Sequence, residues 1–183
     1  MDEIVKAALK KWPNVPHCLG WLALDARGDW YMRDDRVQRA GPFPQVKGSR
    51  IRHDKLVEFI ARNYESDAQG CWFFQNGPQR VYVELEAAPL VWRLQWRSDA
   101  LHVRSHADHE MADGVAGEPW LDAQGRLFLV YAAGFGIVHT QDMVEAARAV
   151  EAGLWTPQQM AFEQMPAHFG YVLSPQRLLG KGP

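Results

Sequence analysis

One four-residue turn motif occurs three times in this chain and constrains the fold more than any other feature of the sequence. The pattern Asp-Ala-x-Gly occurs at Asp25–Gly28, Asp67–Gly70 and Asp122–Gly125. An Asp at the start of a type I turn can cap the turn through its side chain, and a Gly at its end tolerates a positive φ. An apolar stretch follows each copy, as at Trp30–Met32 after the first. The chain is therefore expected to contain several short antiparallel hairpins.

Apolar residues at helical spacing predict four helices beside these hairpins. They fall at about residues 2–12, 54–64, 140–152 and 156–165. A further hairpin is predicted where the dipeptide Asn76-Gly77 separates two apolar runs, because Asn-Gly favours the tight turns that join paired strands.

We interpret this pattern as an α+β fold of two related lobes, each a bent antiparallel sheet covered by a helix. Leu24–Gly28 matches Leu121–Gly125, and Leu56–Glu58 matches Met143–Glu145, as an internal duplication would require. On this matching, residues 22–64 should superimpose on residues 119–150. The alternative is coincidence, since turns of this type are common.

The expected organisation follows from this interpretation. An N-terminal helix and the first lobe would occupy residues 1–78, and the second lobe with a C-terminal helix would occupy residues 79–173. Residues 174–183 are expected to form a flexible tail, because chain ends without an apolar pattern tend to fray.

Composition favours a cytoplasmic protein that binds neither nucleic acid nor membrane. The 20 Lys and Arg residues are interleaved with 22 Asp and Glu residues, which gives a net charge of −2 and no basic stripe. No apolar run approaches the roughly 18 residues of a membrane span, and the N-terminus lacks the pattern of a signal peptide. The two cysteines, Cys18 and Cys71, are expected to be reduced and inert.

The stretch from Trp72 to Val81 carries a resemblance to known sequences. With the preceding turns at Asp25 and Asp67, it resembles uncharacterised bacterial proteins classified as domains of unknown function. The resemblance implies a duplicated α+β core, a binding surface between the copies and no established activity. A role in signalling has been suggested for such proteins.

Four residues of this stretch form the expected ligand-binding site: Trp72, Asn76, Gln79 and Arg80. The hairpin turn explains why Asn occurs at position 76, whereas no local structure explains why Gln79 and Arg80 are polar. An aromatic face beside a guanidinium suits an anionic or planar ligand, or the carboxylate of a partner. The alternative is that Arg80 forms a surface ion pair with Glu84 or another nearby acid.

Two further polar groups have both a structural and a functional interpretation. We expect a ladder of cross-strand ion pairs on a solvated face of the sheet. Its acidic members are Glu84 and Glu86 on one strand, and its other members are Arg93, Gln95 and Arg97 on the next. The alternative is the polar floor of a binding cleft.

The other group gives weak candidates for a metal site: His106, Asp108 and His109, together with His102 and Glu110. Imidazoles and carboxylates at short spacing can bind a divalent cation, but solvated loop histidines are commoner. No cofactor is expected, because the dinucleotide and phosphate-loop motifs are absent; His139 stands where the third glycine of Gly134-Phe135-Gly136 would be needed.

These observations establish no reaction and identify no catalytic residue. The leading interpretation is a non-enzymatic module that senses a small ligand or binds a protein partner, with its site between the lobes. One alternative is a small hydrolase-like enzyme that uses the region of His106, Asp108 and His109, with or without a metal. Another is a structural adaptor that docks a partner on its tryptophan-rich faces.

Overall fold

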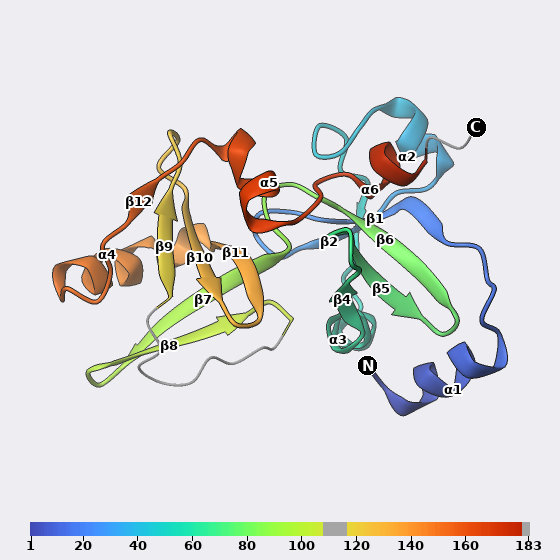
Figure 1. The fold of residues 1–183 in the computed structure, drawn as a ribbon, viewed down its shortest axis with the longest axis horizontal. Coiled ribbons are helices and arrows are strands. Elements are labelled where there is room, and N and C mark those ends of the chain that lie inside the picture. The colour runs from blue at the N-terminus through green and yellow to red at the C-terminus, as the bar shows by residue number, and fades with distance from the viewer. Residues whose placement is uncertain (108–116, 181–183) are drawn as a thin grey trace. The chain divides into compact units, whose positions relative to one another are not determined.

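The computed structural model describes residues 1–107 and 117–180 and shows an α+β fold with two six-stranded mixed sheets (Figure 1). The chain forms two compact units. The first contains Met1–Asp25, Asp29–Ala87 and Gly170–Pro183, and the second contains Ala26–Gly28 and Ala88–Phe169. The predicted fold class of two similar lobes is confirmed. Among the described residues, no helix combines the length and apolar character needed to cross a membrane.

The first unit contains one sheet with strand order β3-β2-β1-β6-β5-β4. Its strands are β1 (Cys18–Leu24), β2 (Trp30–Met32), β3 (Ser49–Arg50), β4 (Tyr64–Ser66), β5 (Trp72–Asn76) and β6 (Gln79–Leu85). Its helices are α1 (Glu3–Lys11), α2 (Asp35–Ala40), α3 (Asp54–Arg62) and α6 (Pro175–Leu179).

The second unit contains the other sheet, with strand order β12-β9-β10-β11-β7-β8. Its strands are β7 (Leu90–Arg97), β8 (Ala100–Ser105), β9 (Glu118–Leu121), β10 (Leu127–Tyr131), β11 (Gly134–Val138) and β12 (Gln158–Gln159). Its helices are η1 (Thr140–Asp142), α4 (Met143–Glu151), η2 (Phe162–Gln164) and α5 (Met165–Phe169), where η denotes a 3₁₀ turn.

The two sheets share one topology. In the first, β1 and β2 form a hairpin, β4, β5 and β6 form an antiparallel meander, and β6 returns parallel to β1. In the second, β7 and β8 form the hairpin, β9, β10 and β11 form the meander, and β11 lies parallel to β7. Five strands of each sheet therefore correspond one to one in chain order, as an internal duplication would produce.

This correspondence corrects the predicted matching of the turns. Asp25–Gly28 joins the two strands of a hairpin, whereas Asp122–Gly125 joins the first two strands of a meander and thus corresponds to Asp67–Gly70. The helices differ as well, because α3 precedes its meander and α4 follows its own. Residues 22–64 and 119–150 are not equivalent, so their predicted superposition is wrong. A short turn motif specifies local geometry but not a position in a sheet.

All three Asp-Ala-x-Gly segments form the same hydrogen-bonded turn. The amides of Asp25, Asp67 and Asp122 each donate to the carbonyl four residues later, at 3.0–3.1 Å. One carboxylate oxygen of each Asp accepts the amide of that same later residue, at 2.9–3.0 Å. The closing glycines have φ between +75° and +83°, a region that residues with a Cβ adopt only under strain. The motif recurs because this turn requires both residue types.

The first sheet buries aromatic residues on both of its faces. Phe59 of α3 packs on Phe74, with ring centroids 5.4 Å apart, and Tyr64 lies 4.8 Å from Trp72 on the same face. The opposite face carries a buried cluster of Cys71, Phe73 and Tyr82, against which Leu19, Val172 and Leu179 pack. The sheet is therefore the middle layer of the first unit.

Three boundaries differ from those expected. The expected domain boundary after residue 78 falls between β5 and β6, which are paired in one hairpin. Residues 174–180, expected to be flexible, include helix α6, which Ser174 caps by accepting the Arg177 amide. No helix begins at Thr156 as expected, because residues 158–159 pair with β9 as strand β12. The 3₁₀ turn η2 begins at Phe162, and helix α5 follows from Met165.

Candidate functional site

The four expected ligand-binding residues lie in one hairpin but on two faces of its sheet. The β5–β6 register pairs Gln75 with Arg80 and Asn76 with Gln79. Because side chains alternate between faces along a strand, Trp72 shares its face with Asn76 and Gln79, and Arg80 lies on the other. The expected pairing of Trp72 with Arg80 is therefore not formed.

The hairpin turn accounts for the local sequence. Gly77 and Pro78 are the two central residues, and Gly77 has φ of +56°, which the first position of a type II′ turn requires. The buried Gln75 side chain donates from Nε2 to the Gly77 carbonyl at 2.9 Å, and this hydrogen bond stabilises the turn.

Trp72 and Gln79 have structural partners in the first unit. The Trp72 side chain is buried against Tyr64. Gln79 donates from Nε2 to the Pro16 carbonyl at 3.0 Å and holds the segment between α1 and β1 against the hairpin. Asn76 is exposed at the end of β5.

Arg80 is half-buried, and its guanidinium lies over the Phe73 ring, with 4.4 Å between Cζ and the ring centroid. No carboxylate within the described ranges forms an ion pair with Arg80. The Glu84 carboxylate, expected as an alternative partner, instead accepts hydrogen bonds from Ser174 and the Gln176 amide. The stacked guanidinium thus keeps donors for an acidic acceptor.

Two more aromatic side chains complete this surface, which we call the Arg80 face: His17, Phe73, Arg80 and Tyr82. The exposed His17 ring packs edge-on against Tyr82, with centroids 5.6 Å apart. The Tyr82 hydroxyl donates to Asp67 at 3.0 Å. Burial raises the pKa of Tyr82, and the hydrogen bond to Asp67 adds to this while Arg80 opposes it, so the hydroxyl stays protonated at neutral pH.

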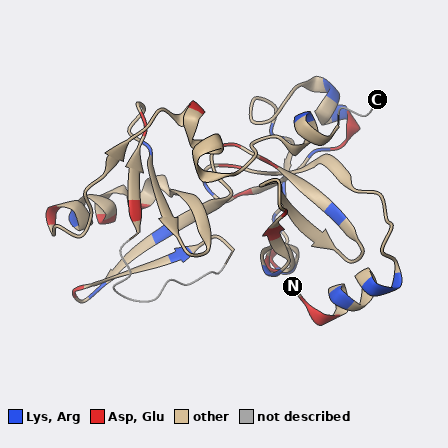
Figure 2. Cartoon of the chain, viewed as in Figure 1, with Lys and Arg blue, Asp and Glu red and all other residues tan. Residues whose placement is uncertain are grey.

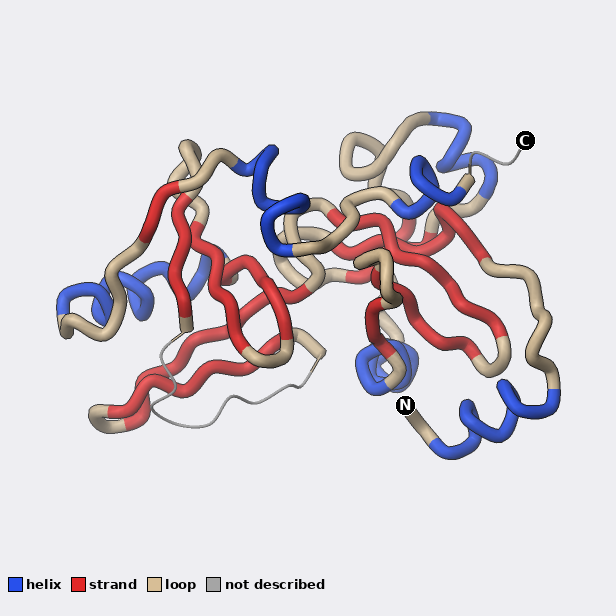
Figure 3. Tube along the Cα trace, in the orientation of Figure 1, coloured by secondary structure: helices blue, strands red, loops and turns tan. Residues whose placement is uncertain are grey.

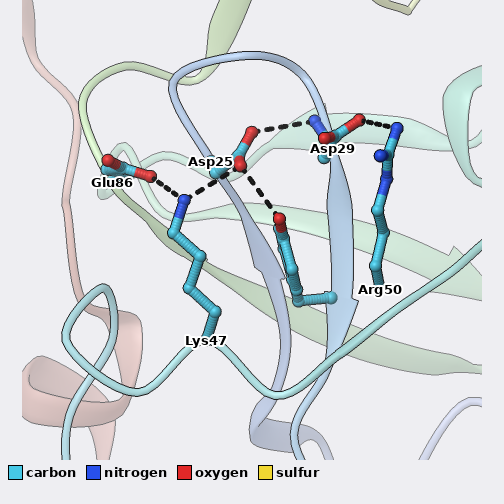
Figure 4. A network of polar contacts seen from close by, with 6 residues as sticks. Asp25, Asp29, Lys47, Arg50 and Glu86 are labelled. Atoms are coloured by element: carbon cyan, nitrogen blue, oxygen red, sulfur yellow. Dashed lines mark hydrogen bonds and ion pairs between the residues drawn. The ribbon is translucent and has the colours of Figure 1, made fainter.

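The densest charged network lies elsewhere in the first unit and centres on Asp25 (Figure 4). Lys47 donates from Nζ to Asp25 at 3.0 Å and to Glu86 at 2.9 Å. The Tyr31 hydroxyl also donates to Asp25, at 3.1 Å, and Arg50 pairs with Asp29 at 2.6 Å. This network ties the loop around Lys47 to the first turn and to the end of β6.

The protonation states of Lys47 and Tyr31 indicate that this network has a structural role. Burial alone would lower the pKa of Lys47, but its bonds to Glu86 and Asp25 raise it overall, so the ammonium stays charged. Burial, followed by the charge of Asp25, raises the pKa of the Tyr31 hydroxyl. Both donors are held in their protonated forms, which suits a structural role better than nucleophilic or general-base chemistry.

The expected ion-pair ladder between two adjacent strands is wrong. Glu84 lies on β6 of the first sheet, whereas Arg93 lies on β7 of the second, so the two strands do not pair. Arg93 instead forms a bidentate pair with Asp142 at 2.6 and 3.0 Å, and Asp142 also accepts the Leu94 amide. The charges of the described residues are mixed in sign along both units (Figure 2).

The expected metal candidates can be placed only in part. His106 accepts the Val91 amide on Nδ1 at 3.1 Å, whereas Asp108 and His109 lie outside the described residues. In residues 1–107 and 117–180, no three His, Cys, Asp or Glu side chains gather as metal ligands. Burial raises the pKa of the Cys18 thiol and raises that of Cys71 to about 11, so neither thiol is a ready nucleophile at neutral pH.

Comparison with solved structures finds two proteins of the DUF1285 family. The one from Shewanella baltica OS155 is 15% identical, with a TM-score of 0.44, over 70% of this chain and 91% of that chain. The one from Silicibacter pomeroyi DSS-3 is 13% identical, with a TM-score of 0.49, over 80% of this chain and 83% of that chain. No curated protein matches the sequence. The family model DUF2944, described as "Protein of unknown function (DUF2946)", matches residues 1–176.

Proposed function

This chain belongs to the DUF2944 family of proteins of unknown function, and we propose that it is a non-enzymatic module that senses a ligand or binds a protein partner. The proposed site is the Arg80 face of the first unit. The observation that carries the proposal is the position of Arg80, which stacks on Phe73 and forms no ion pair with any described carboxylate.

An arginine held in this way is prepared to bind an anion. Its guanidinium is planar, remains charged and offers donors in a fork that matches a carboxylate or phosphate. Stacking on Phe73 fixes the plane of the fork before any ligand arrives, which reduces the entropy lost on binding. The guanidinium covers the Phe73 ring with one side, and the proposed ligand would stack a flat group on the other.

The ligand that fits this arrangement is a planar group carrying a negative charge, such as an aromatic acid or a phosphorylated ring. His17, exposed beside Tyr82, adds a second nitrogen donor at the edge of the face. Gln79 supports the site indirectly, because its bond to the Pro16 carbonyl positions the segment that carries His17.

Phenyl phosphate is a suitable probe, since it combines a ring with an anion. Titration followed by amide chemical shifts should move the signals of β5 and β6, and phenyl phosphate should bind more tightly than inorganic phosphate. Removing a charged, bidentate donor costs about 1.5–3 kcal/mol, so Arg80→Ala should weaken binding by roughly 10- to 100-fold. Arg80→Lys should lie between, because lysine keeps the charge but loses the fork.

Arg52→Ala is the matched control, because Arg52 is an exposed arginine of the same unit that makes no ion pair within the described residues. It should bind phenyl phosphate like the wild type. Equal affinity of the wild type and Arg80→Ala would refute the proposal, as would an equal loss in Arg80→Ala and Arg52→Ala.

The proposal includes a cytoplasmic location and a small ligand or protein, not nucleic acid or a membrane, as the partner. Cys18 and Cys71 are both free, which suits a reducing compartment. The interleaved charges of the sequence also offer no extended basic surface for phosphates. Fractionation of cells that express the tagged protein tests the location, and its recovery with membranes would contradict it.

A further inference from the structure

The C-terminal segment Gly170–Leu179, which we call the strap, lies on the sheet of the first unit. It runs as a loop into helix α6 (Figure 3). The Val172 amide donates to the Gly70 carbonyl at 3.0 Å, and the Leu85 amide donates to the Leu173 carbonyl at 2.8 Å. Val172 and Leu179 of the strap pack on the Cys71 cluster. The Tyr171 hydroxyl donates to the Ala87 carbonyl at 2.9 Å, and Gln176 donates from Nε2 to Gln38 at 2.9 Å. The strap therefore docks by backbone bonds, apolar contacts and side-chain hydrogen bonds.

One buried carboxylate accepts two of the hydrogen bonds that hold the strap in place. Glu84 of β6 is 5% exposed and accepts hydrogen bonds from the Ser174 hydroxyl at 2.5 Å and the Gln176 amide at 3.0 Å. Both donors belong to the strap. Throughout the described part of the chain, no Lys, Arg or His lies within ion-pairing distance of Glu84.

The charged and titratable groups that face Glu84 do not neutralise it. Arg33, after β2, acts on it at long range but donates its hydrogen bonds to the carbonyls of Gly20, Gly41 and Val46. Arg177 of α6 also acts only at long range, and the Cys71 thiol is neutral. Burial raises the pKa of Glu84 above its ordinary value of 4.5, against the opposing effects of Ser174, Gln176 and the two arginines.

We propose that Glu84 is a pH-sensitive latch: in its ionised form it loosens the strap, and in its protonated form it closes the strap over the Cys71, Phe73 and Tyr82 cluster. A buried carboxylate without a counter-ion is costly, and opening the strap returns it to water. Because the folded pKa is raised, the stabilisation is fully present below about pH 4.5 and is lost as the pH rises through the raised value.

Opening the strap would also remove the Val172 and Leu179 side chains that pack on the cluster containing Phe73. Phe73, the ring beneath Arg80, belongs to the cluster that the strap covers. Whether the strap is closed or open would thus change how rigidly Phe73 supports the Arg80 guanidinium. Because Glu84 controls the strap, the affinity for the ligand would then depend on pH. This last link rests on the proposed function, whereas the latch itself does not.

Amide hydrogen exchange of Val172 and Leu85 tests the latch without any ligand, because each amide takes part in a hydrogen bond between the strap and the rest of the first unit. After correction for intrinsic exchange, the wild type should protect these amides more strongly near pH 4 than at neutral pH, relative to amides of β10 in the second unit. At neutral pH, Glu84→Gln should slow their exchange by roughly three- to tenfold, because it keeps an acceptor and removes the charge. Near pH 4 the two proteins should agree.

Glu58→Gln, on the exposed side of α3, is the control and should leave the strap unchanged. The latch is overturned if wild-type protection of the strap is equal or weaker near pH 4, or if Glu84→Gln exchanges as fast as the wild type or faster at neutral pH. Phenyl phosphate titration of Glu84→Gln then tests the link to Arg80 separately. Unchanged affinity together with slower strap exchange would overturn the link while supporting the latch.

Discussion

Two glycines in identical turns allow the docking of the strap to be measured against a matched reference. Gly70 and Gly125 both close an Asp-Ala-Gln-Gly turn, with φ of +79° and +75°. A Cβ at Gly125 would meet nothing within 4 Å. A Cβ at Gly70 would clash with the Gly170 carbonyl, whose carbon would lie at 2.9 Å, and would come within 3.1 Å of the Tyr171 Cα. These obstacles are backbone atoms, so the strap itself would have to move.

The magnitudes follow from these contacts. Alanine in the left-handed region costs roughly 1–2 kcal/mol, which is the full expected loss of unfolding free energy for Gly125→Ala. Gly70→Ala carries the same cost and also disturbs the two backbone bonds of the strap, each worth about 0.5–1.5 kcal/mol. The expected loss for Gly70→Ala is therefore about 2–5 kcal/mol. The effect of alanine on the unfolded chain is the same in both variants and cancels in the difference.

Urea-induced unfolding followed by tryptophan fluorescence measures both losses. Amide exchange in β5 and β10 then assigns each loss to a unit, because a chain with two compact units need not unfold in a single two-state transition. Gly70→Ala should also speed exchange of the Val172 amide, whereas Gly125→Ala should not. Equal losses in the two variants, with an unchanged strap, would refute the argument that the strap is packed against Gly70.

Two further predictions concern the ion pairs. Lys47→Met should destabilise the first unit by about 1–3 kcal/mol in urea unfolding, because it removes the ammonium that pairs with the buried Asp25 carboxylate. Arg50→Met should cost under about 1 kcal/mol, because the Arg50 side chain is exposed. Asp142→Asn should destabilise the second unit at neutral pH and abolish part of its acid sensitivity. Although burial raises the pKa of Asp142, its bonds to Arg93 and the Leu94 amide lower that pKa overall, below 3.8. The stabilisation from Asp142 is therefore present above pH 3.8 and is lost on acidification. Urea midpoints that shift equally with pH in the wild type and the variant would contradict this.

Local sequence signals predicted the local structure well. The Asp-Ala-x-Gly turns, the Asn76-Gly77 hairpin and the helices α1, α3 and α4 all depend on residues close together in the chain. Such elements are decided by turn chemistry and by apolar spacing, both of which can be read directly. The fold class followed from their number and order.

Long-range pairing was not predictable from these signals. Each central pair of strands is parallel, β1 with β6 and β7 with β11, and joins residues separated by most of a unit. The chain also leaves the first sheet after β6 and enters the second at β7, which separates Glu84 from Arg93. Nothing local marks this change of sheet, because both strands carry the alternating pattern of a half-buried strand.

The candidate site shows that some of the missing information was nevertheless present in the sequence. A two-residue turn at Gly77-Pro78 fixes the register of its hairpin, and this pairs Gln75 with Arg80 and Phe73 with Tyr82. Alternation along the two strands then places Arg80 on the same face as Phe73 and excludes Trp72 from that face. Counting back from the turn therefore identifies the aromatic residue that supports the arginine. It cannot identify the strap, whose position depends on Glu84 and Gly70, two residues that no local pattern connects to the C-terminus.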